Sequence, residues 1–295
     1  MGFTAYGEVK NMVRLSVLVN DKTSKVIVRQ DKTTKEKFIV KSLYKLHIDD
    51  EDLVDYEGVK IPYEINSINT LSGTPGFAEV VTIFILPKKY VVITKFLEDY
   101  ETLFDYSMLM LTEAKCKMII NRILELKVIM DAKGIFHGDL KSDNIMINKA
   151  GDVVIIDFGS AKPLSASYEN LLHNDLWSTP EYIATGKASH DPYYVWVIAL
   201  LVYEMVVGNY AFDTLKEIDN ETLPNIPFNI SAKLTDFLRR GLEKDVDHRM
   251  KFDDMKNCSW LRRNNTKPKP IRSGAKFVSA FKSERLESNG LKLDE

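Results

Sequence analysis

Hydrophobic and polar residues alternate along the first third of the chain in a pattern that predicts an antiparallel sheet. Polar turns separate three stretches rich in β-branched residues, and two more stretches follow a break at Pro75-Gly76. The expected strands are 13–19, 25–30, 37–43, 80–86 and 90–94. After an acidic loop at 49–57, Pro62 can begin a helix that runs to about Leu71. We therefore expect a small β-rich lobe with one helix.

After residue 95 the apolar residues recur at helical spacing instead. A polar connector at 95–101, suited to a hinge, precedes the expected helices 103–108, 112–133, 193–207, 231–243 and 252–261. The segment 193–207 is apolar on nearly every side, which predicts a helix buried at the centre of a larger lobe. The last residues are rich in Lys, Arg, Pro, Ser and Asn and predict a basic tail, either solvated or docked on the lobes or on a partner. The expected domains are 1–96, 97–262 and 263–295.

Composition and charge narrow the class of protein. The chain has 295 residues, of which 45% are hydrophobic and 28% charged, as in ordinary globular proteins. Its net charge of -2 creates no general attraction for nucleic acid, and its two cysteines argue against a disulfide scaffold. Neither a membrane span nor a signal peptide is recognisable. We expect an intracellular protein that binds neither nucleic acid nor membrane directly.

Three polar residues are spaced through 136–162 around two short apolar strands. Asp139 follows a helix, Asn144 opens the strand at 145–147, and Asp157 ends the strand at 153–156. A tight turn between these strands would bring Asn144 and Asp157 close together. Because Mg²⁺ takes few protein oxygens beside substrate phosphates, such a pair suits it.

The run H-G-D-L-K-S-D-N followed by D-F-G resembles the catalytic loop and metal loop of eukaryotic-type Ser/Thr protein kinases. The resemblance implies an α+β, bilobal fold and phosphoryl transfer from ATP. It implies that Asp139 accepts the proton of the substrate hydroxyl, that Lys141 neutralises charge on the γ-phosphate, and that Asn144 and Asp157 hold Mg²⁺. The run S-T-P-E-Y resembles the end of the activation segment and would place Thr179 near Asp139.

The resemblance also implies a nucleotide site in the small lobe. Lys41 on the third strand would hold the α- and β-phosphates, and Glu64 on the helix would pair with it. The adenine pocket would consist of Val26 and Ile39 above the ring, Met146 below it, Thr94 as gatekeeper, and the carbonyl of Lys95 and amide of Leu97 at the ring edge.

Two departures from the family pattern affect activity. The glycine-rich loop is absent, because its glycine positions fall near Val19, Asp21 and Ser24. Since Asp21 adds a charge of the same sign as phosphate, we expect weak ATP affinity. Gly138 stands where the family has an arginine that contacts a phosphate on the activation loop, so we expect activity without phosphorylation of that loop.

Two further departures affect the scaffold. Gly186 stands where the family has the glutamate that pairs with Arg249, so either Arg249 has another carboxylate partner or the segment is looser. Tyr194 stands where the buried central helix carries an aspartate that braces the catalytic loop, and no substitute brace is visible in the sequence.

Two other function classes compete with a protein kinase. H-G-D-L also occurs in the small-molecule kinases related to aminoglycoside and choline kinases, but Lys141, S-T-P-E-Y and Arg249 favour a protein kinase. The absent glycine loop suggests a pseudokinase that serves as a binding module. Retention of Lys41, Glu64 and the Asp139, Asn144 and Asp157 set favours catalysis.

The substrate is expected to be a basic protein. Acidic residues would ring the cleft mouth and pair with Arg or Lys beside the target hydroxyl, unless they are only a solvated rim: Glu98, Asp99, Glu101, Asp105 and Asp143. The runs L-F-D-Y and I-D-F-G-S-A resemble the PIM and calmodulin-dependent branch, and the loss of motifs is similar to the baculovirus protein kinase 1 family. That similarity implies a viral Ser/Thr kinase in a host cell or virion, acting on an arginine-rich DNA-packing protein. The sequence leaves a homodimer open.

Overall fold

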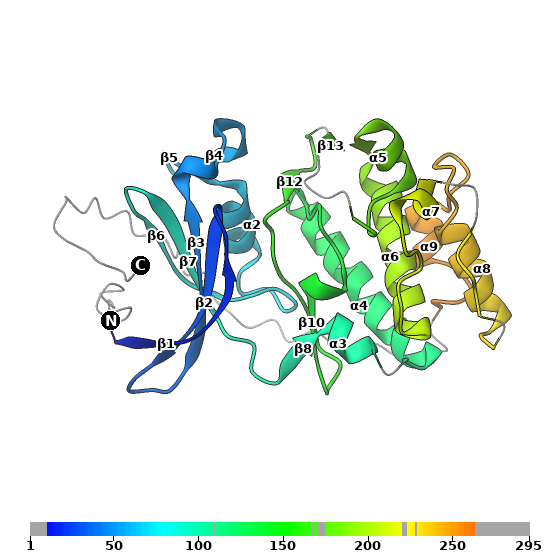
Figure 1. Cartoon of the computed structure of the whole chain (residues 1–295), viewed down its shortest axis with the longest axis horizontal. Helices are drawn as coiled ribbons and strands as arrows, with labels where there is room; N and C mark the ends of the chain where they lie inside the picture. The colour runs from blue at the N-terminus through cyan, green and yellow to red at the C-terminus, as the bar shows by residue number, and fades with distance from the viewer. Residues whose placement is uncertain are drawn as a thin grey trace. The chain divides into compact units, whose positions relative to one another are not determined.

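The computed structural model describes residues 11–108, 110–166, 168–169, 175–219, 223–227 and 229–262. They form two compact units, of which the first ends at Glu98 and the second begins at Asp99 (Figure 1). The sequence placed this boundary between residues 96 and 97. The basic tail expected at 263–295 lies outside the described residues.

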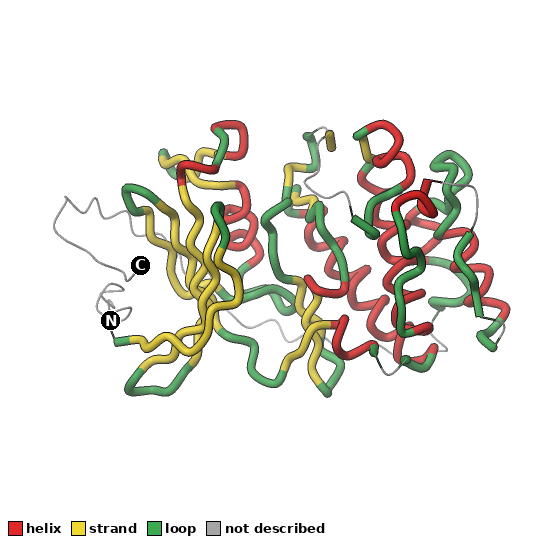
Figure 2. Tube along the Cα trace, viewed as in Figure 1, coloured by secondary structure: helices red, strands yellow, loops and turns green. Residues whose placement is uncertain are grey.

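The first unit is built on a five-stranded sheet in the order β1-β2-β3-β7-β6, in which every neighbouring pair is antiparallel (Figure 2). The five expected strands all form, as β1 (Met12–Asn20), β2 (Ser24–Asp31), β3 (Lys37–Tyr44), β6 (Val80–Ile85) and β7 (Lys89–Lys95). Short polar turns join β1 to β2 and β2 to β3. In each of them an aspartate carboxylate, from Asp21 or Asp31, accepts hydrogen bonds from backbone amides two and three residues further on.

The helix expected after Pro62 is α2 (Tyr63–Leu71), with Pro62 at its N-cap. Its Ile65 is fully buried in a cluster with Ile83 and Val92 of the sheet, so the apolar face of α2 forms the core of the unit. The prediction of a loop at 49–57 was wrong in part, because these residues contain η2 (Asp50–Asp52) and β4 (Leu53–Tyr56). β4 forms a hairpin with β5 (Val59–Pro62), and η1 (Lys45–His47) precedes them. The apolar residues of the hairpin pack on the same core, which outweighs the acidic composition.

The second unit is mainly helical (Figure 2). Its helices are α3 (Leu103–Ser107), α4 (Glu113–Ala132), α5 (Pro180–Thr185), α6 (His190–Val207), α7 (Leu215–Asp219), α8 (Ala232–Gly241) and α9 (Phe252–Lys256). As the sequence predicted, α6 is buried on almost every side, from Tyr193 to Met205. The last helix was expected to reach residue 261 but ends at Lys256. There the Asn257 side chain donates to the Asp253 carbonyl at 2.8 Å, a local bond that competes with a further helical turn.

Short strands position the polar loops of this unit. A three-stranded sheet has the order β11-β10-β8, from β8 (Tyr100–Thr102), β10 (Ile145–Asn148) and β11 (Val153–Ile155). The connector expected at 95–101 therefore ends in a strand. Two-stranded pairs join β9 (Ile135–Phe136) to β12 (Lys162–Pro163), and β13 (Tyr168–Glu169) to β14 (Lys187–Ala188). Within the described ranges, no helix has the length and apolar character needed to cross a membrane.

Candidate active site

Asp139 lies in the loop between β9 and η3 (Ser142–Asn144), and its carboxylate is held by two neighbours. The Asn144 side-chain amide donates to the Asp139 carboxylate and to its backbone carbonyl, each at 2.8 Å. The Lys141 ammonium lies 3.0 Å from the same carboxylate oxygen as the amide. Only 12% of the Asp139 side chain is exposed. The two contacts therefore give the carboxylate a fixed orientation, and its role toward a substrate hydroxyl stays a prediction.

Lys141 lies between two carboxylates. Its ammonium is 3.0 Å from Asp139 and 3.6 Å from Asp175. Burial lowers the pKa of Lys141, but the charges of Asp139 and Asp175 outweigh burial and raise that pKa above its ordinary value. Lys141 is therefore a permanent cation beside Asp139, as stabilisation of a transferring phosphoryl group requires.

His137 joins the catalytic loop to the end of β11. Its Nδ1 lies 3.2 Å from the Asp139 amide nitrogen and its Nε2 lies 3.0 Å from the Ile156 carbonyl oxygen. Because an amide can only donate, Nδ1 is the acceptor and Nε2 carries the proton. The ring is fully buried and lies against Phe158, with centroids 4.8 Å apart. The neutral imidazole thus fixes the spacing between Asp139 and the D-F-G turn.

Asn144 and Asp157 are the expected metal ligands; Asn144 directly precedes β10, and Asp157 comes two residues after the end of β11. Ile145 is opposite Ile155, and the Ile156 amide donates to the Asn144 carbonyl at 3.0 Å. Asp157 has a left-handed backbone, with φ of 58°, and an exposed side chain. The Asn144 amide nitrogen is directed at Asp139, which leaves its amide oxygen as a ligand. An amide oxygen and an exposed carboxylate are donors that fit Mg²⁺, although the ligand role of both stays a prediction.

Thr179 lies near Asp139, as the sequence predicted. It is the N-cap of α5, where its fully buried hydroxyl accepts from the Tyr182 amide at 3.2 Å. Asp139 and Thr179 line the same small cavity, together with Trp177 and Tyr182. The cavity therefore brings a carboxylate residue, a hydroxyl residue and two aromatic residues together.

Lys41 and Glu64 form the ion pair that the sequence predicted. The Lys41 ammonium lies 2.6 Å from the Glu64 carboxylate, and the two side chains are 17% and 10% exposed. The strand register places Val26 opposite Lys41 and Thr94 opposite Ile39, so four of the expected nucleotide residues share one face of the sheet.

The remaining expected nucleotide residues are Lys95, Leu97 and Met146, and the structure describes each of them within its own unit. Lys95 ends β7, where its ammonium pairs with Glu79 at 2.8 Å, and Leu97 is half-buried in the connector that follows. Met146 lies on β10 of the second unit, opposite Thr102 and Val154. Contact of these residues with an adenine ring stays a prediction.

Arg249 has another carboxylate partner, which settles the alternative that the sequence left open. Its guanidinium donates to both oxygens of Glu181, at 3.0 and 2.8 Å, and only 1% of its side chain is exposed. Glu181 was missed as the partner although it is the glutamate of S-T-P-E-Y. The sequence feature that could have identified Glu181 is its position in the first turn of a helix that begins at Pro180.

Glu204 is a second residue that sequence reasoning missed. It is 3% exposed on α6, and its carboxylate accepts from the Ser142 hydroxyl at 3.0 Å. Burial, with the nearby Asp143 charge as a smaller cause, raises the pKa of Glu204 to about 7, against the opposing effect of the Ser142 hydrogen bond. A carboxyl inside a strongly apolar helix is the signal that marks it.

Comparison with known proteins agrees with this geometry. A family model described as "Protein kinase domain" matches residues 18–261. Serine/threonine-protein kinase pim-2 of Danio rerio is 27% identical over 190 residues, which are 60% of this chain and 61% of that protein. Serine/threonine-protein kinase ppk6 of Schizosaccharomyces pombe is 24% identical over 266 residues, 88% of this chain and 32% of that protein. Smooth muscle myosin light chain kinase of Gallus gallus is 30% identical over 171 residues, 52% of this chain and 9% of that protein. The chain spans less than two thirds of the length of each of these relatives.

Proposed function

The chain belongs to the protein kinase domain family, and on that premise we propose that it transfers the γ-phosphate of ATP to Ser or Thr hydroxyls of proteins. The observation that carries the proposal is the set of contacts around Asp139. One carboxylate oxygen faces a permanent ammonium and the amide of a metal-ligand candidate, at 3.0 and 2.8 Å. That arrangement orients a hydroxyl and offsets negative charge, the two things that phosphoryl transfer needs from a protein.

ATP and Mg²⁺ are the proposed cofactors. When bound, they would supply the phosphoryl group and a cation that offsets its negative charge. The chain contributes Lys41, aimed by Glu64, toward the phosphates, and Asn144 and Asp157 toward the cation. Asp139 accepts the hydrogen of the substrate hydroxyl, while Lys141 neutralises charge near the transferred group.

A radiolabelled-phosphate assay tests this function. Asp139→Asn keeps the shape of the side chain but removes its charge, so we expect at least a 100-fold loss of transfer to a Ser/Thr protein substrate. Asp152→Asn is the matched control, because Asp152 is exposed in the β10–β11 turn. Its carboxylate accepts from the Asn148 side chain, which also accepts from the Asp152 amide. Equal activity of the Asp139→Asn variant and the unaltered protein would contradict the mechanism. Absence of transfer by the unaltered protein, together with intact folding, would favour the pseudokinase alternative.

We also propose that the substrate is rich in Arg or Lys. Asp143, directly before Asn144, is exposed and carries a negative charge next to the candidate site. Two other acidic candidates are already engaged, since Glu98 pairs with Lys37 at 3.2 Å and Asp105 accepts from the Thr102 hydroxyl at 2.7 Å. Asp99 and Glu101 are exposed as well, but Asp143 is the candidate directly beside Asn144, so we use it to test the preference. We expect Asp143→Ala to raise the KM for arginine-rich peptides several-fold and to leave the KM for ATP unchanged. Equal turnover of basic and acidic peptides by the unaltered protein would remove the proposal.

The similarity to the baculovirus protein kinase 1 family supports a narrower proposal, that the substrate is an arginine-rich DNA-packing protein of a virion. The arginine side chains of such a protein would pair with the Asp143 carboxylate. Preference for such a protein over an equally basic unrelated peptide, measured as kcat/KM, is the test.

A further inference from the structure

Two adjacent tyrosines of α6 hold the backbone of the candidate catalytic loop. The Tyr194 hydroxyl accepts a hydrogen bond from the His137 amide at 3.1 Å, and the Tyr193 hydroxyl accepts one from the Leu140 amide at 2.9 Å. Both hydrogen bonds are buried, and the side chains are 0% and 6% exposed. The two bonds therefore attach the loop to the central helix on either side of Asp139.

The segment between these two attachment points has little freedom of its own. It consists of Gly138 and Asp139, and the Asp139 amide is bonded to the His137 ring. Because a buried amide without an acceptor is costly, the loop strongly prefers the position in which both amides reach the tyrosine hydroxyls. A shift of either amide would move the Asp139 carboxylate with it.

Aromatic contacts and an ion cluster hold the two tyrosines in turn. Phe136 meets the Tyr193 and Tyr194 rings edge-on, with centroids 5.0 and 5.6 Å apart, and the Lys127 ammonium lies 5.1 Å from the centre of the Tyr194 ring. Lys127 is 2% exposed and lies 2.7 Å from Asp131 and 2.6 Å from Asp191.

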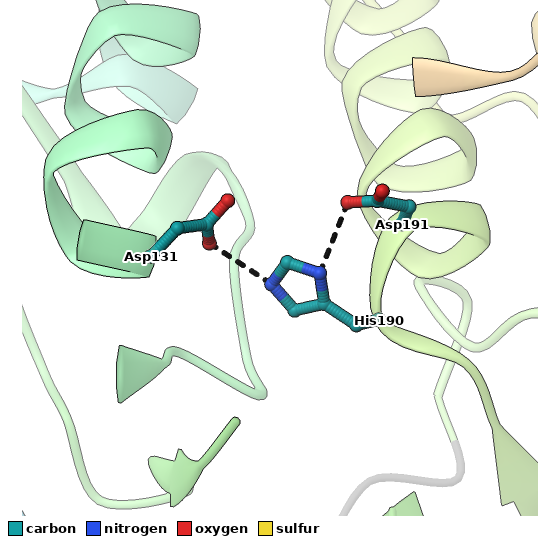
Figure 3. Close-up of side chains that lie close together, drawn as sticks. All are labelled: Asp131, His190 and Asp191. Carbon is teal, nitrogen blue, oxygen red and sulfur yellow. Dashed lines mark ion pairs between the residues drawn. The ribbon is translucent and has the colours of Figure 1, made fainter. Parts of the chain in front are cut away.

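His190 completes this cluster between α4 and α6. Figure 3 shows its ring between the two carboxylates, with one nitrogen 3.0 Å from Asp131 and the other 3.0 Å from Asp191. The three side chains have spacing that a metal ion could use. Lys127, however, already supplies a cation to both carboxylates, which identifies the cluster as a structural connection at the start of α6.

We propose that Tyr193 and Tyr194 are positioning residues, whose hydroxyls set the place of Asp139 for phosphoryl transfer. This role rests on the proposed kinase function. The Tyr194 hydroxyl thereby holds the catalytic loop, a role for which the sequence showed no substitute residue. The hydroxyls act through the backbone and touch no reacting atom.

Removal of single hydroxyls tests the proposal. Tyr193→Phe and Tyr194→Phe keep the rings and delete one acceptor each. The matched control is Tyr203→Phe, because Tyr203 lies on the same helix and its hydroxyl bonds the Asn225 carbonyl at 2.9 Å, a backbone partner outside the catalytic loop. We expect each of the first two variants to lower kcat about 10-fold or more with little change in the KM for ATP, since a small misplacement of a catalytic group has effects of about that size. Tyr203→Phe should lower the unfolding midpoint comparably and leave kcat unchanged.

Amide hydrogen exchange, read residue by residue by NMR, tests the brace independently of activity and of any variant. In the unaltered protein the His137 and Leu140 amides should exchange as slowly as amides in the middle of α6. In Tyr194→Phe the His137 amide should exchange at least 10-fold faster and the Leu140 amide much less so, with the reverse in Tyr193→Phe. The proposal is overturned if both amides exchange as fast as those of Lys149 and Ala150 in the exposed β10–β11 turn, or if kcat falls no more in these variants than in Tyr203→Phe. Slow exchange in a protein without kinase activity would leave the brace intact and contradict only the proposed function.

Discussion

At the scale of single residues, Gly138 shows how closely the catalytic loop packs. Its φ is 78°, and a Cβ atom placed on it would lie 2.2 Å from the backbone oxygen of Ser160. Real Cβ atoms do not come so close to a carbonyl, so any side chain forces the backbone of one segment to move. Gly138 is therefore required by local space as well as by conformation.

We expect Gly138→Ala to destabilise the protein far more than the same change at Gly134. Gly134 has nearly the same φ, 72°, but no atom lies within 4 Å of its added Cβ. Gly134→Ala should cost about 1–2 kcal/mol from the left-handed backbone alone. Gly138→Ala should cost about 1–3 kcal/mol beyond that because of the overlap, and should also lower kcat. Urea unfolding of both variants measures the difference, and equal costs would contradict the close approach.

Glu204 should make stability depend on pH. Its folded pKa, about 7, lies above the ordinary value of 4.5, so the folded protein binds this proton more tightly than the unfolded chain does. The resulting stability is complete below pH 4.5 and is lost as pH rises through about 7. Relative to Glu204→Gln, the unaltered protein should lose about 1–3 kcal/mol of unfolding free energy across this range. Urea denaturation of both proteins at several pH values checks it, and parallel curves would rule it out.

At the scale of elements, the structure ties α5 to the rest of the second unit through one buried ion pair. Arg249 reaches both oxygens of Glu181 in the first turn of α5 and also donates to the carbonyls of Glu243 and Pro192. The segment that carries Thr179 is therefore connected to α6 and to the loop before α9 despite the glycine at 186. The sequence allowed either another carboxylate partner for Arg249 or a looser segment, and the structure has the first.

We expect Glu181→Gln to lower the free energy of unfolding, which measures how much this ion pair contributes. It leaves a buried guanidinium without its carboxylate, a change that costs about 3–5 kcal/mol. Asp236→Asn is the control, because the Asp236–Arg240 pair is separated by 3.6 Å and about half exposed, and its loss should cost less than about 1 kcal/mol. Thermal and urea unfolding report both, and a Glu181→Gln variant as stable as Asp236→Asn would show that the ion pair contributes little.

Sequence periodicity predicted the elements well where one physical signal dominated. The five strands of the main sheet, α2, the long α4 and the apolar α6 followed from alternation, Pro62 and uniform hydrophobicity. The β4–β5 hairpin was missed because its acidic residues suggested a loop while its apolar residues pack on the core of the first unit. Motif spacing likewise predicted the Lys41–Glu64 ion pair and the nearness of Thr179 to Asp139, while the catalytic roles of these residues stay predictions. It could not reveal Glu181 or the tyrosine hydroxyls, whose partners are far away in sequence.

At the scale of the whole molecule, the expectation of weak ATP affinity rests on the turn between β1 and β2. The Asp21 carboxylate accepts from the amides of Thr23 and Ser24, each at 2.7 Å. Those hydrogen bonds lower the pKa of Asp21, so the carboxylate is charged at neutral pH. The Thr23 and Ser24 amides therefore donate to the Asp21 carboxylate. In a glycine-rich turn, backbone amides of this kind are available to phosphate.

Asp21→Gly should therefore lower the KM for ATP, by about 10-fold if one repulsive charge and two engaged amides are relieved. Asp31→Gly is the control, because Asp31 makes the same turn at the other end of β2, with amides at 2.7 and 2.8 Å. It should leave the KM unchanged. Steady-state kinetics with varied ATP decide the matter, and an unchanged KM in Asp21→Gly would remove this explanation of weak affinity.

The contact between Gly138 and Ser160 also limits how this protein can change during evolution. Each of the mutations that give residue 138 a side chain first meets the Ser160 carbonyl oxygen. A residue with a side chain could occupy this position only if the D-F-G-S turn also shifted, so two changes would be needed together. The glycine is thus entrenched by its neighbour, and the position is closed to the stepwise substitutions by which most loops diversify.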